Sequence, residues 1–139
     1  KIEVNTGTIA VPVWTQIMGL DEDGIAFKQS TKETDFKDAN DAGIDKPVII
    51  GGGWGCTLKG ARMEDSDDGT RDPGQAAVEA VADATGYDAQ LPFRISSPAA
   101  AGAETITFIA SVASVDAFGG ADKASWTAEL KLYGLPVRA

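Results

Sequence analysis

Residues 104–134 read ETITFIASVASVDAFGGADKASWTAELKLYG, and two alternating patterns fill most of this stretch. Strand side chains point to opposite faces in turn, so such alternation places the apolar residues on one face of a β-strand. The stretch therefore predicts two long strands joined by a turn at 118–122. Their apolar positions are Ile106, Phe108, Ala110 and Val112 in the first strand, and Ala124, Trp126, Ala128, Leu130 and Leu132 in the second.

The two strands are long for a small protein. Strands in globular domains usually have about five or six residues, whereas each of these would reach roughly 40 Å if unbroken. An exposed strand edge invites aggregation, so the protein must close, cover or share its edges. The pattern favours a subunit of an assembly over a free enzyme.

Weaker patterns predict four more strands and a long loop. The segment 35–53 shows little periodicity and is expected to be a long inter-strand loop, of the kind that is commonly functional. The strands are expected at 8–17, with Ile9, Val11, Val13 and Ile17 on one face; at 25–34, with Ile25 and Phe27 as apolar anchors; at 54–63, with Trp54, Cys56 and Leu58 inward; and around Leu91, Phe93 and Ile95.

A short helix is expected over 73–85. Asp72 suits the N-cap, a proline follows at the first helical position, Gln75 occupies the third position of a capping box, and Gly86 suits the end. The total is about six strands with one flanking α-helix. The fold class is therefore mainly β, a β-sandwich or barrel subunit, in a single domain of residues 1–139.

The composition of the 139-residue chain sets further bounds. Hydrophobic residues make up 43%, which is typical of a globular protein, and no apolar run approaches the roughly 18 residues of a membrane helix. The chain starts at Lys1 rather than Met, so an upstream segment is compatible with the sequence. The net charge of −9 disfavours tight wrapping of nucleic acid. An acidic surface serves solubility or lets DNA slide past, and composition leaves both open.

No motif for catalysis, a cofactor or a metal is found in the sequence. Histidine is absent, which removes most activated nucleophiles and the usual zinc sites, and the lone Cys56 is expected to be a small buried residue. The glycine run 51–55 lacks the ending of a phosphate-binding loop, and the acidic loop 64–72 lacks calcium-loop spacing. The carboxylates Glu33, Glu64 and Glu129 could in principle pair as acid and base, but nothing in the sequence places any two of them together. We expect a protein that is not an enzyme and has no cofactor.

The order of these pieces resembles the major tail (tail tube) proteins of long-tailed bacteriophages. The resemblance covers most of the chain and depends on the order of its parts. The first part is a polar strand followed by the acidic loop 35–53. The second is a strand and another acidic loop that lead to a helix opening Asp-Pro-Gly-Gln at 72–75. A strand Leu-Pro-Phe-Arg-Ile at 91–95 follows, and the chain closes on a hairpin that ends in Trp-Thr-Ala-Glu-Leu-Lys-Leu-Tyr-Gly-Leu-Pro at 126–136.

The resemblance implies a structural subunit of a phage tail tube. Such subunits form hexameric rings, the rings stack into a hollow conduit for viral DNA, and neighbouring sheets join into a barrel around the lumen. The implied partners are further copies of the chain, a tape-measure protein during assembly, other tail proteins and DNA in transient, non-specific passage, with no membrane. The implied location is the virion tail, after synthesis in the host bacterial cytoplasm.

The resemblance also suggests roles for two groups of residues and for the chain start. The loop 35–53 is the candidate ring-stacking loop, and 1–8 is a candidate terminal arm. Polar residues on the strands are candidates to face the lumen or another subunit. The loop candidates are Asp35, Asp38, Asp41, Asp45 and Lys46, and the strand candidates are Lys28, Glu33, Glu129 and Lys131.

Two other function classes stay open. A monomeric β-sandwich that binds a ligand such as carbohydrate needs exposed aromatic residues, and Trp14 is the tryptophan on the non-core phase of its strand. A hydrolase with paired acids is the least supported class, because nothing in the sequence brings two carboxylates together.

Overall fold

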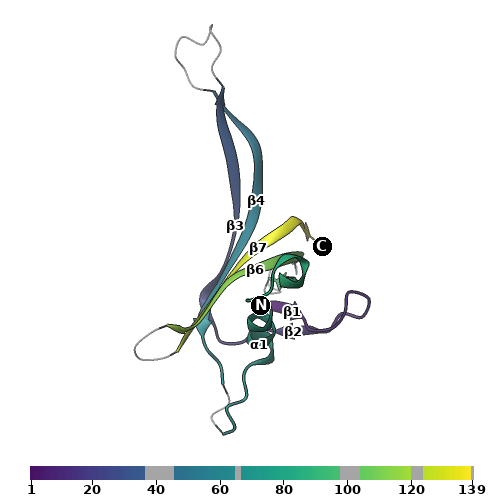
Figure 1. Ribbon diagram of the computed structural model, residues 1–139, viewed down its shortest axis with the longest axis vertical. Coiled ribbons are helices and arrows are strands. Elements are labelled where there is room, and N and C mark those ends of the chain that lie inside the picture. Colours follow the sequence, from purple (N-terminus) through teal and green to yellow (C-terminus); the bar gives the residue numbers. More distant parts are fainter. Residues whose placement is uncertain (37–45, 65–66, 98–103, 120–123, 139) are drawn as a thin grey trace.

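The computed structural model describes residues 1–36, 46–64, 67–97, 104–119 and 124–138 (Figure 1). Within them seven strands form one antiparallel sheet, and one α-helix and a short 3₁₀ helix accompany it, which confirms the mainly-β class with one flanking α-helix. The strand that raises the count above six is β1, which was expected to be part of a terminal arm. The elements are β1 Ile2–Asn5, β2 Trp14–Gln16, β3 Leu20–Phe36, β4 Lys46–Ala61, α1 Pro73–Ala80, η1 Gly86–Ala89, β5 Gln90–Ser96, β6 Thr105–Gly119 and β7 Ser125–Arg138.

The strand order is β2-β1-β5-β6-β7-β4-β3, so the C-terminal hairpin lies in the middle of the sheet. The predicted alternation holds there: Trp126, Ala128 and Leu130 of β7 are buried, and Val112 of β6 lies opposite Leu130. The helix α1 packs against β1, β2 and β6 and contributes the fully buried Val78. The core therefore lies between the apolar face of the sheet and α1.

The hairpin of β3 and β4 is longer than expected, and the predicted loop 35–53 is wrong at both ends. β3 continues to Phe36 and β4 begins at Lys46, with Phe36 opposite Lys46. β4 pairs with β7 only over 55–61, so the outer part of the hairpin is a two-stranded ribbon. Figure 1 shows this ribbon rising away from the sheet. Pairing with β3 holds the glycine-rich part of β4 in strand conformation.

The predicted strand over 8–17 is also wrong for most of its length. Only Trp14–Gln16 forms a strand, because β2 pairs with β1 and the residues before it make the connection. Ile9, Val11 and Val13 are 88%, 69% and 53% exposed, whereas Ile17 is buried. The apolar residues do alternate in the sequence, but of these four only Ile17 is buried in the core.

The helix begins as predicted and ends early. The Asp72 carboxylate accepts a hydrogen bond from the Gln75 N–H at 2.9 Å, which confirms the N-cap. The helix ends at Ala80 instead of 85, because tight turns follow in which Ala82 N–H donates to the Glu79 carbonyl. Gly86, with φ of 63°, begins η1 rather than closing α1.

We predict that Leu130→Asp unfolds or strongly destabilises the chain. Leu130 is buried at the centre of the sheet, and an uncompensated buried charge costs about 3–5 kcal/mol. Urea unfolding followed by circular dichroism measures the loss. The matched control is Lys131→Asp on the exposed face of the same strand, for which a change within about 0.5 kcal/mol is expected. Equal stability of the two variants would contradict the face assignment.

Candidate assembly surfaces

The long edge of the sheet is β3. It stands last in the strand order and pairs with β4 alone, so along its 17 residues one side carries backbone groups with no strand partner among the described elements. The opposite edge, β2, has only three residues. Proteins that stay monomeric usually shorten, cover or charge such edges. This sheet therefore has one short edge and one long edge, and the long edge carries charges of both signs along β3.

The ribbon adds a second exposed edge. Before Gly55, over residues 46–54, β4 does not pair with β7, so among the described strands the ribbon has free edges on both sides. An isolated two-stranded hairpin is marginally stable at best in water. The ribbon is therefore a segment that contact with another chain would stabilise.

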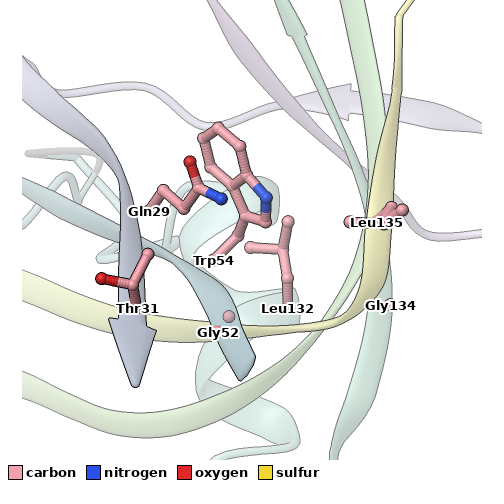
Figure 2. A pocket seen from close by; sticks show the side chains of 8 residues that line it. Gln29, Thr31, Gly52, Trp54, Leu132, Gly134 and Leu135 are labelled. Atoms are coloured by element: carbon pink, nitrogen blue, oxygen red, sulfur yellow. The ribbon is translucent and has the colours of Figure 1, made fainter. Parts of the chain in front are cut away.

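A pocket of about 340 Å³ opens where the ribbon departs from β7 (Figure 2). We call it the flare pocket, and Trp54, Leu132 and Leu135 are its apolar lining residues. Trp54 is only half-buried, and its ring stacks on Phe27 at 5.0 Å between centroids. Phe27 in turn lies 5.4 Å from the ring of Phe108. The flare pocket is thus the open end of the hydrophobic core, which β7 and the ribbon leave uncovered.

The connection between β1 and β2 is a rigid projection. The buried Asn5 accepts hydrogen bonds from the Gly7 and Val13 N–H groups, both at 2.9 Å, and donates to the Thr8 carbonyl at 3.1 Å. A Cβ on Gly7 would lie 2.4 Å from the Val11 carbonyl oxygen, so the turn is closed too tightly for any other residue. We call its exposed residues Ile9, Val11 and Val13 the apolar tip.

The polar face of the sheet brings three of the four strand candidates together. Lys28, Gly55 and Lys131 form one cross-strand row, so two lysines flank a residue without a side chain. Glu129 lies two residues before Lys131, and these residues line a trough of about 640 Å³. All three charged candidates are exposed. The side chain of Glu33 lies outside the described residues.

The ring-stacking candidates fall mostly outside the described residues. Asp38, Asp41 and Asp45 belong to the segment 37–45, of which the structure gives no description. Asp35 and Lys46 are strand residues of the ribbon rather than loop residues, with Asp35 opposite Pro47. The stacking role of this group stays a prediction.

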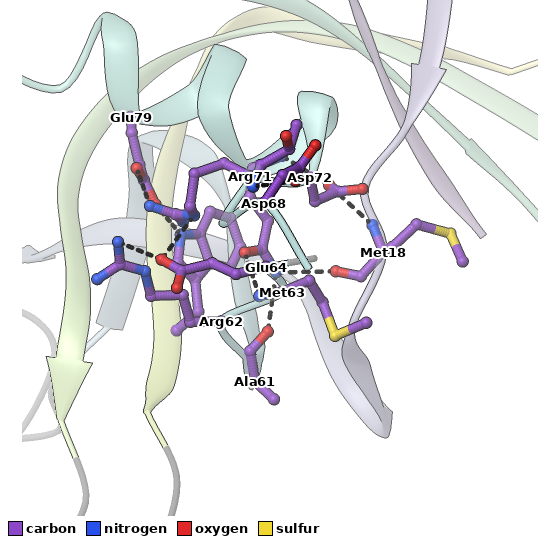
Figure 3. A network of polar contacts seen from close by, with 12 residues as sticks. Met18, Ala61, Arg62, Met63, Glu64, Asp68, Arg71, Asp72 and Glu79 are labelled. Atoms are coloured by element: carbon purple, nitrogen blue, oxygen red, sulfur yellow. Dashed lines mark hydrogen bonds and ion pairs between the residues drawn. The ribbon is translucent and has the colours of Figure 1, made fainter. Parts of the chain in front are cut away.

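The acidic loop is tied to α1 by ion pairs (Figure 3). Arg71 binds both carboxylate oxygens of Glu79 and lies 3.6 Å from Glu64, which also pairs with Arg62. The indole of the buried Trp126 donates to Glu79 at 2.9 Å. These carboxylates therefore have cationic partners. Among the described residues, no group of three or more acidic, histidine or cysteine side chains is arranged to hold a metal ion.

Gln75 fastens α1 to the sheet in a way that the sequence did not indicate. Its fully buried side chain donates to the carbonyls of Met18 and Ala61, both at 2.9 Å, and accepts from the Met63 N–H at 3.1 Å. The predicted capping box assigned this side chain to Asp72 instead. In the sequence, Gln75 stands out only as a glutamine beside small apolar residues of the helix. That pattern does not distinguish a capping side chain from one that binds the sheet backbone.

A second polar cluster covers β1 on the polar face. Glu3 is buried and accepts hydrogen bonds from Arg94 at 2.9 Å and from Lys1 at 3.3 Å. Burial alone raises the pKa of Glu3, but these two cationic partners outweigh burial, and the net pKa lies below 4.5. The Arg94 guanidinium also lies 4.6 Å from the centre of the Trp14 ring. Arg94 therefore occupies one face of the half-buried Trp14 ring.

Cys56 is buried in the core as predicted, and burial raises the pKa of its thiol to about 12. The thiol stays protonated near neutral pH, which disfavours a nucleophilic role. No helix among the described residues is long and apolar enough to span a membrane.

Comparison with known proteins gives a match in fold but none in sequence families. No protein-family model matches the chain, and no curated protein matches it. The fold is similar to a chain in the solved structure of the virion of a native gene transfer agent particle, with a TM-score of 0.63. That match covers 99% of this chain and 95% of the other at 13% identity. The likeness at this identity shows a shared fold over the full chain length.

We predict that Gln75→Leu destabilises the protein by on the order of 3 kcal/mol, because the Met18 and Ala61 carbonyls and the Met63 N–H lose their hydrogen bonds to the buried Gln75 side chain. Thermal and urea unfolding measure the change. Gln16→Leu is the matched control, since Gln16 is exposed. A loss below about 0.5 kcal/mol for Gln75→Leu would show that water replaces the side chain at no cost.

We predict that Glu3→Gln makes the free energy of unfolding less dependent on pH below neutrality. Because the pKa of Glu3 is lowered on folding, its ionised form contributes stability that is present above pH 4.5, the usual carboxyl value, and is lost as the pH falls through the folded-state pKa. The variant should lose about 1–3 kcal/mol at pH 7 and less at pH 3. Urea unfolding at several pH values tests this, and equal losses at both would contradict it.

Proposed function

We propose that the protein is a virion structural subunit, and specifically a phage tail-tube subunit. In this proposal, copies form hexameric rings that stack into a hollow conduit for viral DNA. The observation that carries the proposal is the 17-residue edge strand β3, which continues into a ribbon with both edges free. Further copies of the chain would supply the missing strand partners.

The asymmetry of the sheet supports a ring. The two edges of the sheet are different, so pairing an edge of one copy with the opposite edge of the next is a head-to-tail contact. Head-to-tail contacts close into rings when the rotation between copies allows it. The ribbon extends beyond the sheet, which suits a contact with a neighbouring ring.

The structural neighbour supports the virion role. The solved assembly is described as a virion of a gene transfer agent, and the likeness extends over nearly the whole of both chains. Transferring that role to this chain places it in the virion, with other virion proteins as partners. Tail position, a tape-measure partner and synthesis in the host cytoplasm follow from the sequence resemblance alone.

The polar face of the sheet is our candidate for the lumen wall. Lys28, Glu129 and Lys131 lie on the face opposite the core, and a ring of such sheets would present that face as a continuous surface. The three named residues carry two positive charges and one negative charge, so repulsion of DNA phosphates would come from the net charge of −9 that each whole copy carries. The proposed role is mechanical and electrostatic, with no catalytic step and no cofactor.

A carbohydrate-binding module is the weaker alternative. Arg94 occupies one face of the Trp14 ring, and the exposed rings of Tyr87 and Tyr133 meet at 80° rather than forming a flat platform. Sugar-binding surfaces need exposed, coplanar aromatic residues. The geometry of these rings therefore favours the assembly role.

We predict that the purified chain forms rings or tubes at micromolar concentration. Light scattering after size exclusion and negative-stain microscopy measure the assembly. Because each copy carries −9, raising the ionic strength from about 0.01 M to about 0.15 M, which shortens the Debye length from about 30 to 8 Å, should promote association. Stable monomers at all salt concentrations, particularly with affinity for a glycan, would refute the proposed function.

A further inference from the structure

We propose that the apolar tip of one copy docks in the flare pocket of the next copy around a ring. The inference rests on the proposed function and adds to it a specific contact between copies. The tip consists of Ile9, Val11 and Val13, and the pocket is lined by Trp54, Leu132 and Leu135.

The apolar tip is exposed and held in one conformation. Three large aliphatic residues are exposed, while the buried Asn5 holds the turn that carries them with three hydrogen bonds. A turn fixed in this way loses little conformational entropy on binding. The tip is therefore a preorganised projection, and its exposed residues do not contribute to the core of their own chain.

The flare pocket has the matching chemistry. Its floor is Trp54 and Leu132, and Leu135 is 82% exposed at its side. Figure 2 shows Gln29 and Thr31 on the β3 side, where they supply polar groups at the rim. An aliphatic group entering this pocket would extend the core beyond Phe27, the last aromatic ring that packs on Phe108.

Both surfaces are free of charge in a chain of which 24% is charged. Residues 4–20 contain no acidic or basic side chain, and the same is true of 47–58 and 132–137. Two copies that carry −9 each repel one another, so a stable contact requires segments without like charges. The centres of protein interfaces are depleted in charged residues for a related reason. This shared neutrality favours a second copy as the occupant of the pocket.

The sheet topology places the two surfaces at opposite ends. The apolar tip projects from the β1–β2 connection beside the short edge, and the flare pocket lies among β3, β4 and β7 beside the long edge. A head-to-tail contact brings opposite ends of neighbouring sheets together. The same association that pairs the edges would therefore bring the tip of one copy to the pocket of the next.

Charge insertion tests the contact without disturbing the fold. Val11→Asp and Leu135→Asp alter exposed residues, so circular dichroism and melting temperature should match the parent chain. Each should raise the concentration needed for ring formation at least tenfold. The matched control is Ala80→Asp on the exposed end of α1, which adds the same charge and should assemble like the parent. Assembly of Val11→Asp at the parent concentration would overturn the inference.

Crosslinking tests whether the tip and the pocket meet. In a Cys56→Ala background, the double variant Val11→Cys/Leu135→Cys should form a ladder of disulfide-linked chains under mild oxidation, since a disulfide requires Cβ atoms about 3.5–4.5 Å apart. The control Val11→Cys/Ala80→Cys should remain single chains. Rings without a ladder would overturn the tip contact and leave the proposed function standing. Absence of both rings and ladder would overturn the two together.

Discussion

Every backbone N–H and C=O group of a strand needs a hydrogen-bond partner, and this requirement governs the structure. The seven described strands lie in one sheet in a fixed order, and β3, at the end of that order, pairs with β4 alone. Its outer half belongs to a ribbon that leaves the sheet, so the hydrophobic core has no cover at that end. The free edge and the open pocket both follow from one feature, the lack of pairing between β4 and β7 before Gly55.

The other end of the subunit is closed by buried polar side chains. Gln75 joins α1 to the backbone at Met18, Ala61 and Met63, and Asn5 closes the turn before β2. A buried polar group is tolerated only when its hydrogen bonds are made, so each of these residues specifies one local geometry. The chain thus fixes its own structure near the helix and leaves its contacts unsatisfied near β3. This difference between the two ends of the molecule is expected of a subunit rather than of a self-sufficient domain.

The sequence predicted the buried residues well in the central strands and poorly near the edges of the sheet. The alternation in β6 and β7 predicted the buried face because those strands lie at the centre of the sheet. The same alternation at Ile9, Val11 and Val13 was misleading, since the sequence does not show that the pairing of β1 with β2 leaves these residues in a turn. The ribbon was missed because glycines at 51–53 break the periodic signal, and only the partner strand β3 makes them extended.

The sequence predicted some features of the candidate surfaces and missed others. Period two placed Glu129 and Lys131 on one polar face, but the row of Lys28, Gly55 and Lys131 depends on a register that no single strand encodes. The distribution of charge is visible in the sequence without any register. If copies of the chain associate as proposed, contacts through the neutral residues 4–20 and 132–137 avoid the like-charge repulsion expected of a chain with net charge −9. In the proposed assembly, repulsion over the rest of the surface would disfavour other modes of association along the long free edge.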